Sequence, residues 1–137
     1  MLKELYTQRV RFDEVDALGI VWHGHYVKYL EDGREAWGRK YGLTYMGMYH
    51  TEGFSVPVVD LKMKYKRPLK YEEHFTIETW FVPCDAAKLI LRYRILNERS
   101  EEVLEAESMQ VFLSRETSEL QLSSPAFYEE WKLRMGV

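Results

Sequence analysis

Apolar and polar side chains alternate along the chain most regularly from Val59 to Lys66. A repeat of two places the apolar side chains on one face of an extended chain and the charged side chains on the other. This segment is therefore predicted to be a half-buried strand, and Arg67-Pro68 is predicted to end it. Further strands are predicted over residues 5–12, 75–82, 88–96 and 103–114.

A different repeat runs from Gly24 to Tyr41, where apolar or small residues recur at steps of three and four. Such spacing gives one face of a helix, and Gly42 is a typical residue to end it. Gly33 lies on this face, although glycine in a helix costs about 1 kcal/mol relative to alanine. We therefore expect the helix backbone to pack closely against a sheet at Gly33.

The order of the elements is one strand, one helix, a series of strands and a short last helix. The connections at residues 83–85 and 97–102 are short and polar, as antiparallel hairpins require. Ser124-Pro125 predicts the N-cap and first residue of the last helix, over residues 125–135. This order predicts an α+β fold in which an antiparallel sheet curls around the long helix. Since no repeat or linker interrupts the chain, we expect a single domain over residues 1–137.

Composition narrows the classes of function. The net charge of −3 gives no basic surplus, which argues against nucleic acid as a partner. No stretch approaches the roughly 18 apolar residues of a membrane span, and the first residues do not read as a signal peptide. The single cysteine, Cys84, cannot form a disulfide within the chain. We therefore expect a cytoplasmic protein that does not associate with membranes.

The segment with the most chemistry reads FDEVDALGIVWHGHY, from Phe12 to Tyr26. It is too polar for a core strand and too apolar for an ordinary loop. Asp13 and Asp16 precede an apolar run, and His23 and His25 follow it. The two histidines could form part of a metal site, but no third ligand is placed beside them, so we expect no metal.

This segment resembles the signature of hotdog-fold acyl-CoA thioesterases, and more narrowly that of the 4-hydroxybenzoyl-CoA thioesterase family. The resemblance is carried by Asp16-Ala17-Leu18-Gly19-Ile20-Val21-Trp22-His23 together with Tyr26, Tyr29, Glu31 and Arg34. The later stretch from Tyr65 to Glu73 is similar to a second strand-and-turn motif of the family. There are two departures: Asp13 lies one position further from Asp16 than in the family's Asp-x-Asp, and His25 stands where the family usually has Asn.

The resemblance implies a catalytic role for Asp16, as nucleophile or as general base for water. Partial burial of this loop would raise the pKa of the Asp16 carboxyl. The plainer alternative is that Asp16 caps a turn. The resemblance also implies that the backbone N–H of His23, at the start of the helix, meets the thioester carbonyl oxygen.

Further residues are expected to bind the substrate. Gly19 would let the chain turn, Ile20, Val21 and Trp22 would cover the acyl group, and Gly24 would offer a second N–H. Tyr26 and Glu31 are candidates on the helix, although Glu31 could instead pair with Arg34. Tyr45, Met46, Met48 and Tyr49 could line the pocket or belong to the core.

Basic residues are concentrated around the predicted strand from residue 59 to 66. They are Lys62, Lys64, Lys66, Arg67 and Lys70. They could form a solvated face or bind the phosphates of coenzyme A, and Arg67 and Lys88 are the candidates for such binding. Coenzyme A would be part of the substrate, and no other cofactor is expected.

The sequence therefore favours an enzyme that hydrolyses a small or medium acyl-CoA to the free acid and CoA. An acyl carrier protein thioester is an alternative substrate, and a non-catalytic acyl-thioester binding protein is another alternative, motivated by His25. Hydratase chemistry is disfavoured by the seven positions between Asp16 and His23. The resemblance and the exposed edge of a single sheet both imply a homo-oligomer, a dimer or a homotetramer.

Overall fold

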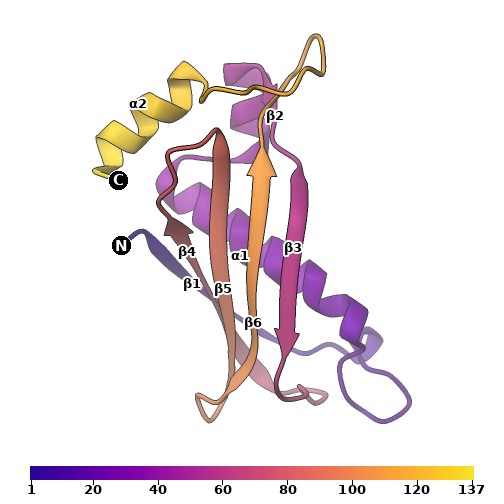
Figure 1. Cartoon of the computed structure of the whole chain (residues 1–137). Helices are drawn as coiled ribbons and strands as arrows, with labels where there is room; N and C mark the ends of the chain where they lie inside the picture. Colours follow the sequence, from indigo (N-terminus) through magenta and orange to yellow (C-terminus); the bar gives the residue numbers. More distant parts are fainter.

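The computed structural model describes all residues from 1 to 137 and shows a five-stranded antiparallel sheet wrapped around one long helix (Figure 1). The strand order is β1 (Lys3–Arg9), β4 (His74–Val82), β5 (Lys88–Asn97), β6 (Glu102–Val111) and β3 (Val58–Tyr65). The helix α1 (Tyr26–Tyr41) lies behind the sheet, and α2 (Ala126–Met135) crosses one end of the molecule. This confirms the predicted α+β class and the sheet around a central helix.

The predicted elements are largely confirmed, with differences at their ends. A 3-10 turn, η2 (His23–His25), precedes α1, and Gly42 ends α1 with a left-handed φ of 84°. The first strand ends at Arg9, earlier than predicted, because residues 12–14 form another 3-10 turn, η1 (Phe12–Glu14). The N-cap of α2 is Pro125 and not Ser124, so that capping prediction was wrong.

Two short features were not predicted. The last long strand stops at Val111, and β7 (Leu113–Ser114) pairs instead with β2 (Phe54–Ser55) in a separate two-stranded sheet. A π-helical segment, η3 (Gly47–Glu52), lies between α1 and β2. Both belong to the region near α2, so they enlarge that end of the molecule without changing the main sheet.

The predicted close approach at Gly33 is confirmed. A Cβ added to Gly33 would lie 2.6 Å from Ile77 Cγ2 and 2.7 Å from Thr79 Oγ1, both on β4. The helix backbone is therefore nearly in contact with the inner face of the sheet. This contact explains why a residue that weakens a helix occupies its apolar face.

Aromatic side chains fill the end of the molecule where α2 lies. Trp37 and Phe81 stack with ring centroids 6.2 Å apart, and Trp131 on α2 packs edge-on against both. Tyr128 stacks on Trp131, and the Trp131 indole N–H donates to the Tyr41 carbonyl at 2.6 Å. We call this part, at the C-terminal end of α1, the closed end, because all four of the packed rings are buried.

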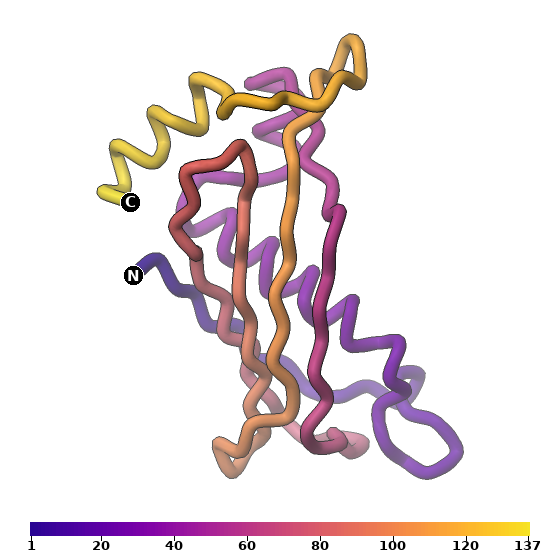
Figure 2. The backbone as a smooth tube through the Cα atoms, viewed as in Figure 1, coloured from indigo at the N-terminus to yellow at the C-terminus, as the bar shows by residue number.

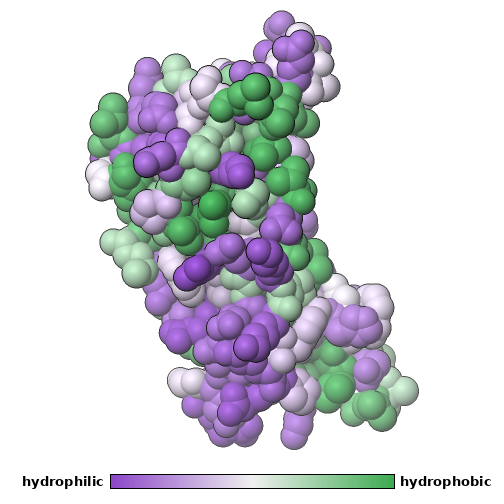
Figure 3. Space-filling model, in the orientation of Figure 1, coloured by the Kyte–Doolittle hydropathy of each residue, from purple (hydrophilic) through white to green (hydrophobic).

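The edge strand β3 is covered less well than the closed end. The edge strand β3 leaves Val59 57% and Tyr65 49% exposed, so its apolar face is covered less than the alternation of residues predicted. An edge strand also presents unpaired N–H and C=O groups to its surroundings. Figure 3 shows the outer sheet face, whose lower half is strongly hydrophilic.

No helix in the chain has the length and apolar character needed to cross a bilayer.

Candidate active site

The loop between β1 and α1 lies at the N-terminal end of α1, away from α2 (Figure 2). We call this part of the molecule the open end. Within the loop, the Asp16 N–H donates to the Ile20 carbonyl at 2.8 Å, and the Gly19 N–H donates to the Asp16 carbonyl at 3.0 Å. Gly19 has a φ of 77°, in the left-handed region. The loop is thus a tight turn that reverses the chain at Gly19, as the sequence predicted.

A second segment, distant in the sequence, fixes this loop from one side. The Val21 N–H donates to the Leu69 carbonyl at 2.9 Å, and the Tyr71 N–H donates to the Gly19 carbonyl at 3.2 Å. Ile20 also forms an antiparallel bridge with Lys70. The two sequence motifs therefore lie side by side in the fold.

Asp16 is exposed in the single chain. Its Oδ1 accepts the Leu18 N–H at 2.8 Å, which is the turn-capping contact foreseen as the plainer role. The partial burial of Asp16 expected from the sequence is not present in the single chain, where the adjacent Ala17 and Leu18 are exposed as well. One carboxylate oxygen nevertheless has no partner within the chain and is free to act on a substrate.

The start of α1 offers two free donors next to this loop. The His23 and Gly24 N–H groups have no acceptor within the chain, whereas the His25 N–H donates to the Trp22 carbonyl at 2.9 Å. Free N–H groups at the N-terminal end of a helix attract negative charge, and the helix dipole adds to that attraction. The turn is therefore suited to hold a carbonyl oxygen on which negative charge develops.

The indole of Trp22 covers this turn. A Cβ at residue 24 would collide with the Trp22 ring, which explains the glycine between the two histidines. The Trp22 ring lies 4.8 Å from the His23 ring and 5.6 Å from the His25 ring, edge-on to the latter. His25, the departure from the family pattern, thus packs against the same indole.

A groove of about 320 Å³ opens beside the turn. It is lined by Ile20, Val21, His23, Tyr26, Tyr65, Lys66, Arg67 and Pro68. The Tyr65 hydroxyl donates to the His23 carbonyl at 2.8 Å, which ties the end of β3 to the turn. The groove brings together five of the residues predicted to act on the substrate. A larger hollow of about 440 Å³ lies on the outer sheet face among charged side chains, away from this turn.

Two predicted substrate residues lie elsewhere. Glu31 is exposed on α1 and its Oε1 is 3.5 Å from Arg34, so the alternative pairing is the one observed. Lys88 begins β5 at the closed end, where its carbonyl accepts the Tyr128 hydroxyl at 3.1 Å. The single chain does not bring Lys88 to the groove. Of the possible pocket residues, Met48 is buried in the core, whereas Tyr45, Met46 and Tyr49 are exposed.

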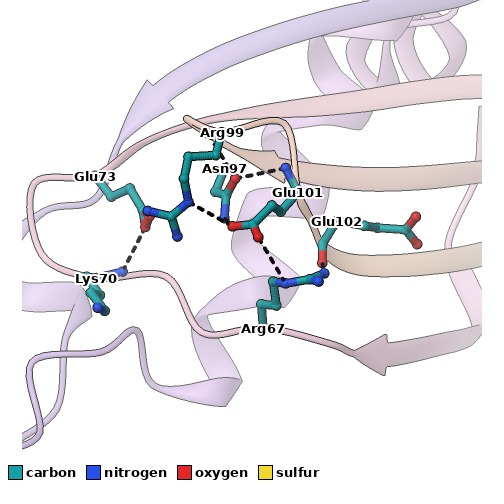
Figure 4. A network of polar contacts seen from close by, with 7 residues as sticks. All are labelled: Arg67, Lys70, Glu73, Asn97, Arg99, Glu101 and Glu102. Carbon is teal, nitrogen blue, oxygen red and sulfur yellow. Dashed lines mark hydrogen bonds and ion pairs between the residues drawn. The ribbon is translucent and has the colours of Figure 1, made fainter.

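Two of the basic residues near β3, Lys66 and Arg67, are paired with carboxylates of the β5–β6 hairpin and β6. The Lys66 ammonium is 2.7 Å from Glu102, and Arg67 donates to the Glu102 carbonyl at 3.0 Å. Arg67 also faces Glu101 at 3.7 Å, within the network that Figure 4 shows around the β5–β6 hairpin. These contacts favour the solvated-face interpretation over a preformed phosphate site.

One residue of this region was missed from the sequence. Glu14 is only 2% exposed, and its Oε1 accepts both the Arg11 N–H and the Tyr29 hydroxyl at 2.8 Å. Burial, and then the hydrogen bond to Glu14, raise the pKa of Tyr29 well above its usual range. Glu14-Val15-Asp16 is an acid-x-acid triplet, so the spacing that was measured from Asp13 is met by Glu14. The acid-x-acid spacing is therefore the sequence signal by which Glu14 could have been found.

Comparison with known proteins adds independent findings. Residues 10–131 match the family model described as "Thioesterase-like superfamily". The chain is 34% identical over 108 residues to the "Putative acyl-CoA thioesterase YneP" of Bacillus subtilis (strain 168), covering 79% of this chain and 78% of that protein.

Solved structures are similar over almost the whole chain. A DHNA-CoA thioesterase from Staphylococcus aureus has a TM-score of 0.87 at 24% identity, over 99% of this chain and 92% of that one. A 4-hydroxybenzoyl-CoA thioesterase mutant, in complex with 4-hydroxybenzoyl-CoA, has a TM-score of 0.82 at 22% identity, over 96% and 99%. These likenesses confirm the hotdog fold.

Proposed function

Since the chain belongs to the thioesterase-like superfamily and is a thioester hydrolase, we propose that it hydrolyses small or medium acyl-CoA thioesters at the Asp16–His23 turn. The observation that carries this proposal is the pairing of a free carboxylate with free donors in one short loop. Asp16 has an unengaged oxygen, and His23 and Gly24 have unengaged N–H groups. Of these three residues, His23 also lines the groove of about 320 Å³. The name of the Bacillus subtilis relative supports acyl-CoA as the substrate class.

The proposed reaction begins with the thioester carbonyl oxygen accepting the N–H groups of His23 and Gly24, which stabilise the developing oxyanion. In one route the Asp16 carboxylate attacks the carbonyl carbon, the C–S bond breaks, and the CoA thiolate takes a proton from water. Water then hydrolyses the resulting anhydride and restores Asp16. In the other route Asp16 takes a proton from a water molecule as the water oxygen bonds to the carbonyl carbon. The C–S bond then breaks, and Asp16 returns the proton to the CoA sulfur.

The acyl group would lie in the groove against Ile20, Val21 and Tyr26, with Trp22 above the turn. We propose that no metal ion or further cofactor takes part. CoA would leave toward the basic residues at the end of β3, where Lys70 is exposed and adjoins Ile20. Binding of its phosphates there would require Arg67 to exchange part of its contact with Glu101.

We also propose a homodimer, with a homotetramer as the larger assembly. The support is the open end itself: Leu18 is 81% exposed, Trp22 50%, and β3 has a free edge. A second copy that covers this surface would give Asp16 the burial that the single chain lacks. Light scattering at micromolar concentration is expected to show at least a dimer, and a monomer that is fully active would contradict this assembly.

The decisive experiment is Asp16→Asn, assayed by thiol release over a panel of aromatic and aliphatic acyl-CoA esters. The amide keeps the shape of the side chain but is neither nucleophile nor base, so turnover is expected to fall roughly 10³-fold or more with the fold unchanged. Asp13→Asn is the matched control and should keep the parent's rate. Near-normal turnover by Asp16→Asn would refute the assignment. Acyl carrier protein esters of the same acids, assayed in parallel, distinguish the two kinds of thioester.

A further inference from the structure

Glu14 is a buried carboxylate that the proposed reaction does not use. It ends the 3-10 turn η1, lies two residues before Asp16, and is 2% exposed. A buried carboxylate is strongly destabilising unless hydrogen bonds and opposite charge compensate for the lost hydration. Its presence in an otherwise exposed loop therefore calls for a specific set of partners.

Those partners join the loop to the helix. Glu14 Oε1 accepts two hydrogen bonds of 2.8 Å, from the Arg11 N–H and from the Tyr29 hydroxyl on α1. Glu14 Oε2 lies 3.7 Å from the Lys28 ammonium, also on α1. Hydrogen bonds to an ionised acceptor are about twice as strong as neutral ones. Tyr29 is itself immobilised, since it is fully buried and its ring packs 4.6 Å from that of Phe75.

The main chain of Glu14 holds the other side of the loop. Its carbonyl accepts the Trp22 N–H at 3.0 Å, directly before His23. The chain from residue 14 to residue 22 is thus closed at its base by Glu14, with Asp16 on one arm and the His23 N–H just beyond the other. Any shift of Glu14 relative to α1 would change the position of Asp16 relative to the free N–H groups.

We propose that Glu14 is a positioning residue, whose buried carboxylate, through Tyr29 and Lys28, fixes the distance between Asp16 and the N–H donors of His23 and Gly24. This inference rests on the proposed function of the Asp16–His23 turn. In the proposed reaction, Glu14 touches neither the substrate nor the reacting atoms. Its effect is on geometry, and a misplacement of about 1 Å at a reacting group can cost about 100-fold in rate.

The test uses two variants that keep the shape of the site. Glu14→Gln retains an oxygen for Tyr29 and Arg11 but loses the charge and turns an amide donor toward Lys28. Tyr29→Phe leaves the carboxylate in place and removes one of its two short hydrogen bonds. We expect kcat to fall roughly 10- to 100-fold in Glu14→Gln and less in Tyr29→Phe, with KM within about twofold of the parent. The double variant should lose less than the product of the two single losses, because both changes disrupt one contact.

A matched control separates positioning from general loss of stability. Phe81→Leu weakens the packing against Trp37 and Trp131 at the closed end, away from Glu14 and Tyr29, so it should lower the unfolding temperature and keep kcat at assay temperatures where the protein is folded. If Glu14→Gln does not fold, Tyr29→Phe decides the question alone.

Folded variants with the parent's kcat, measured while Asp16→Asn is inactive, would overturn the positioning role and leave the proposed function intact. Full activity of Asp16→Asn would instead overturn the proposed function.

Discussion

Aromatic side chains lie near both ends of α1, but Phe12 and Trp22 differ from Trp37 and its neighbours in how far they are buried. At the closed end, Trp37, Phe81 and Trp131 are each at most 4% exposed. At the open end, Phe12 is 75% exposed and Trp22 50%. The closed end packs these rings together within one chain, whereas Phe12 and Trp22 at the open end stay available to a substrate or to a second copy. Stability and proposed catalysis are thus separated along a single helix.

The same contrast holds for polar groups. At the closed end, the Trp131 indole N–H and the Tyr128 hydroxyl donate to main-chain carbonyls. At the open end, the N–H groups of His23 and Gly24 and one oxygen of Asp16 have no partner in the chain. Groups that remain unsatisfied in a tight, otherwise bonded turn are those expected to meet a ligand.

Replacing one tryptophan at each end by alanine gives the largest expected difference. Trp131→Ala empties a fully packed site and should lower the free energy of unfolding by about 3–5 kcal/mol. Trp22→Ala removes a half-exposed ring and should cost about 1 kcal/mol or less, while reducing turnover. Chemical denaturation of both variants, together with thiol-release assays, measures the contrast. Equal losses of stability in Trp131→Ala and Trp22→Ala would contradict the contrast between the two ends.

Two glycine substitutions sharpen the comparison at a smaller scale. Gly33→Ala pushes a methyl group against Ile77 and Thr79 in the packed layer, so we expect a loss of about 1–3 kcal/mol in stability. Gly24→Ala displaces only the exposed Trp22 ring, so unfolding should change little while kcat falls, because the ring covers the proposed oxyanion site. Circular dichroism melts and kcat measurements check both substitutions. A Gly24→Ala variant that is destabilised but fully active would contradict the expected contrast.

The smallest effect concerns the polar network beside the open end. Hydrogen bonding from Asn97 and Arg99 lowers the pKa of the half-exposed Glu101. A carboxyl whose pKa is lower in the folded state stabilises the fold above its unfolded pKa, and this contribution is lost as pH falls through the folded value. The unfolding temperature should therefore drop slightly more steeply from about pH 5 to about pH 3 in the parent than in Glu101→Gln. Glu116→Gln, an exposed carboxylate elsewhere, is the control and should not flatten the curve.

Much of the fold could be predicted because the periodic segments are long. The alternation around Leu61 and Met63 and the spacing of Leu30, Gly33 and Trp37 each specify an element on local grounds. The pairing of β3 with β6 could not be predicted this way, since strand order depends on contacts between distant segments. The π-helical turn η3 has no periodic signal of its own, and it was missed.

For the candidate site, the resemblance singled out one loop but did not indicate how that loop is held. Asp16, Gly19 and His23 lie in one turn, as expected. Glu14 was overlooked because a carboxylate in a polar loop is ordinarily exposed. Its burial depends on Tyr29, which reaches it only after the chain has folded back onto α1. The partial burial of Asp16 was expected from neighbouring apolar residues, but in the single chain Val21 packs into the core, Leu18 and Trp22 are exposed, and Asp16 is exposed with them.

The sheet order has a consequence for how the chain acquires this structure. β4, β5 and β6 follow one another as hairpins, whereas β1 pairs with β4, so that Lys3 lies opposite Trp80. Contacts between distant residues close large loops and form slowly, while hairpins form quickly. On a ribosome, the first strand must wait until more than half of the chain has emerged. Until then the helix that follows it has no complete surface to fold against, and this interval is when a chaperone would be most useful.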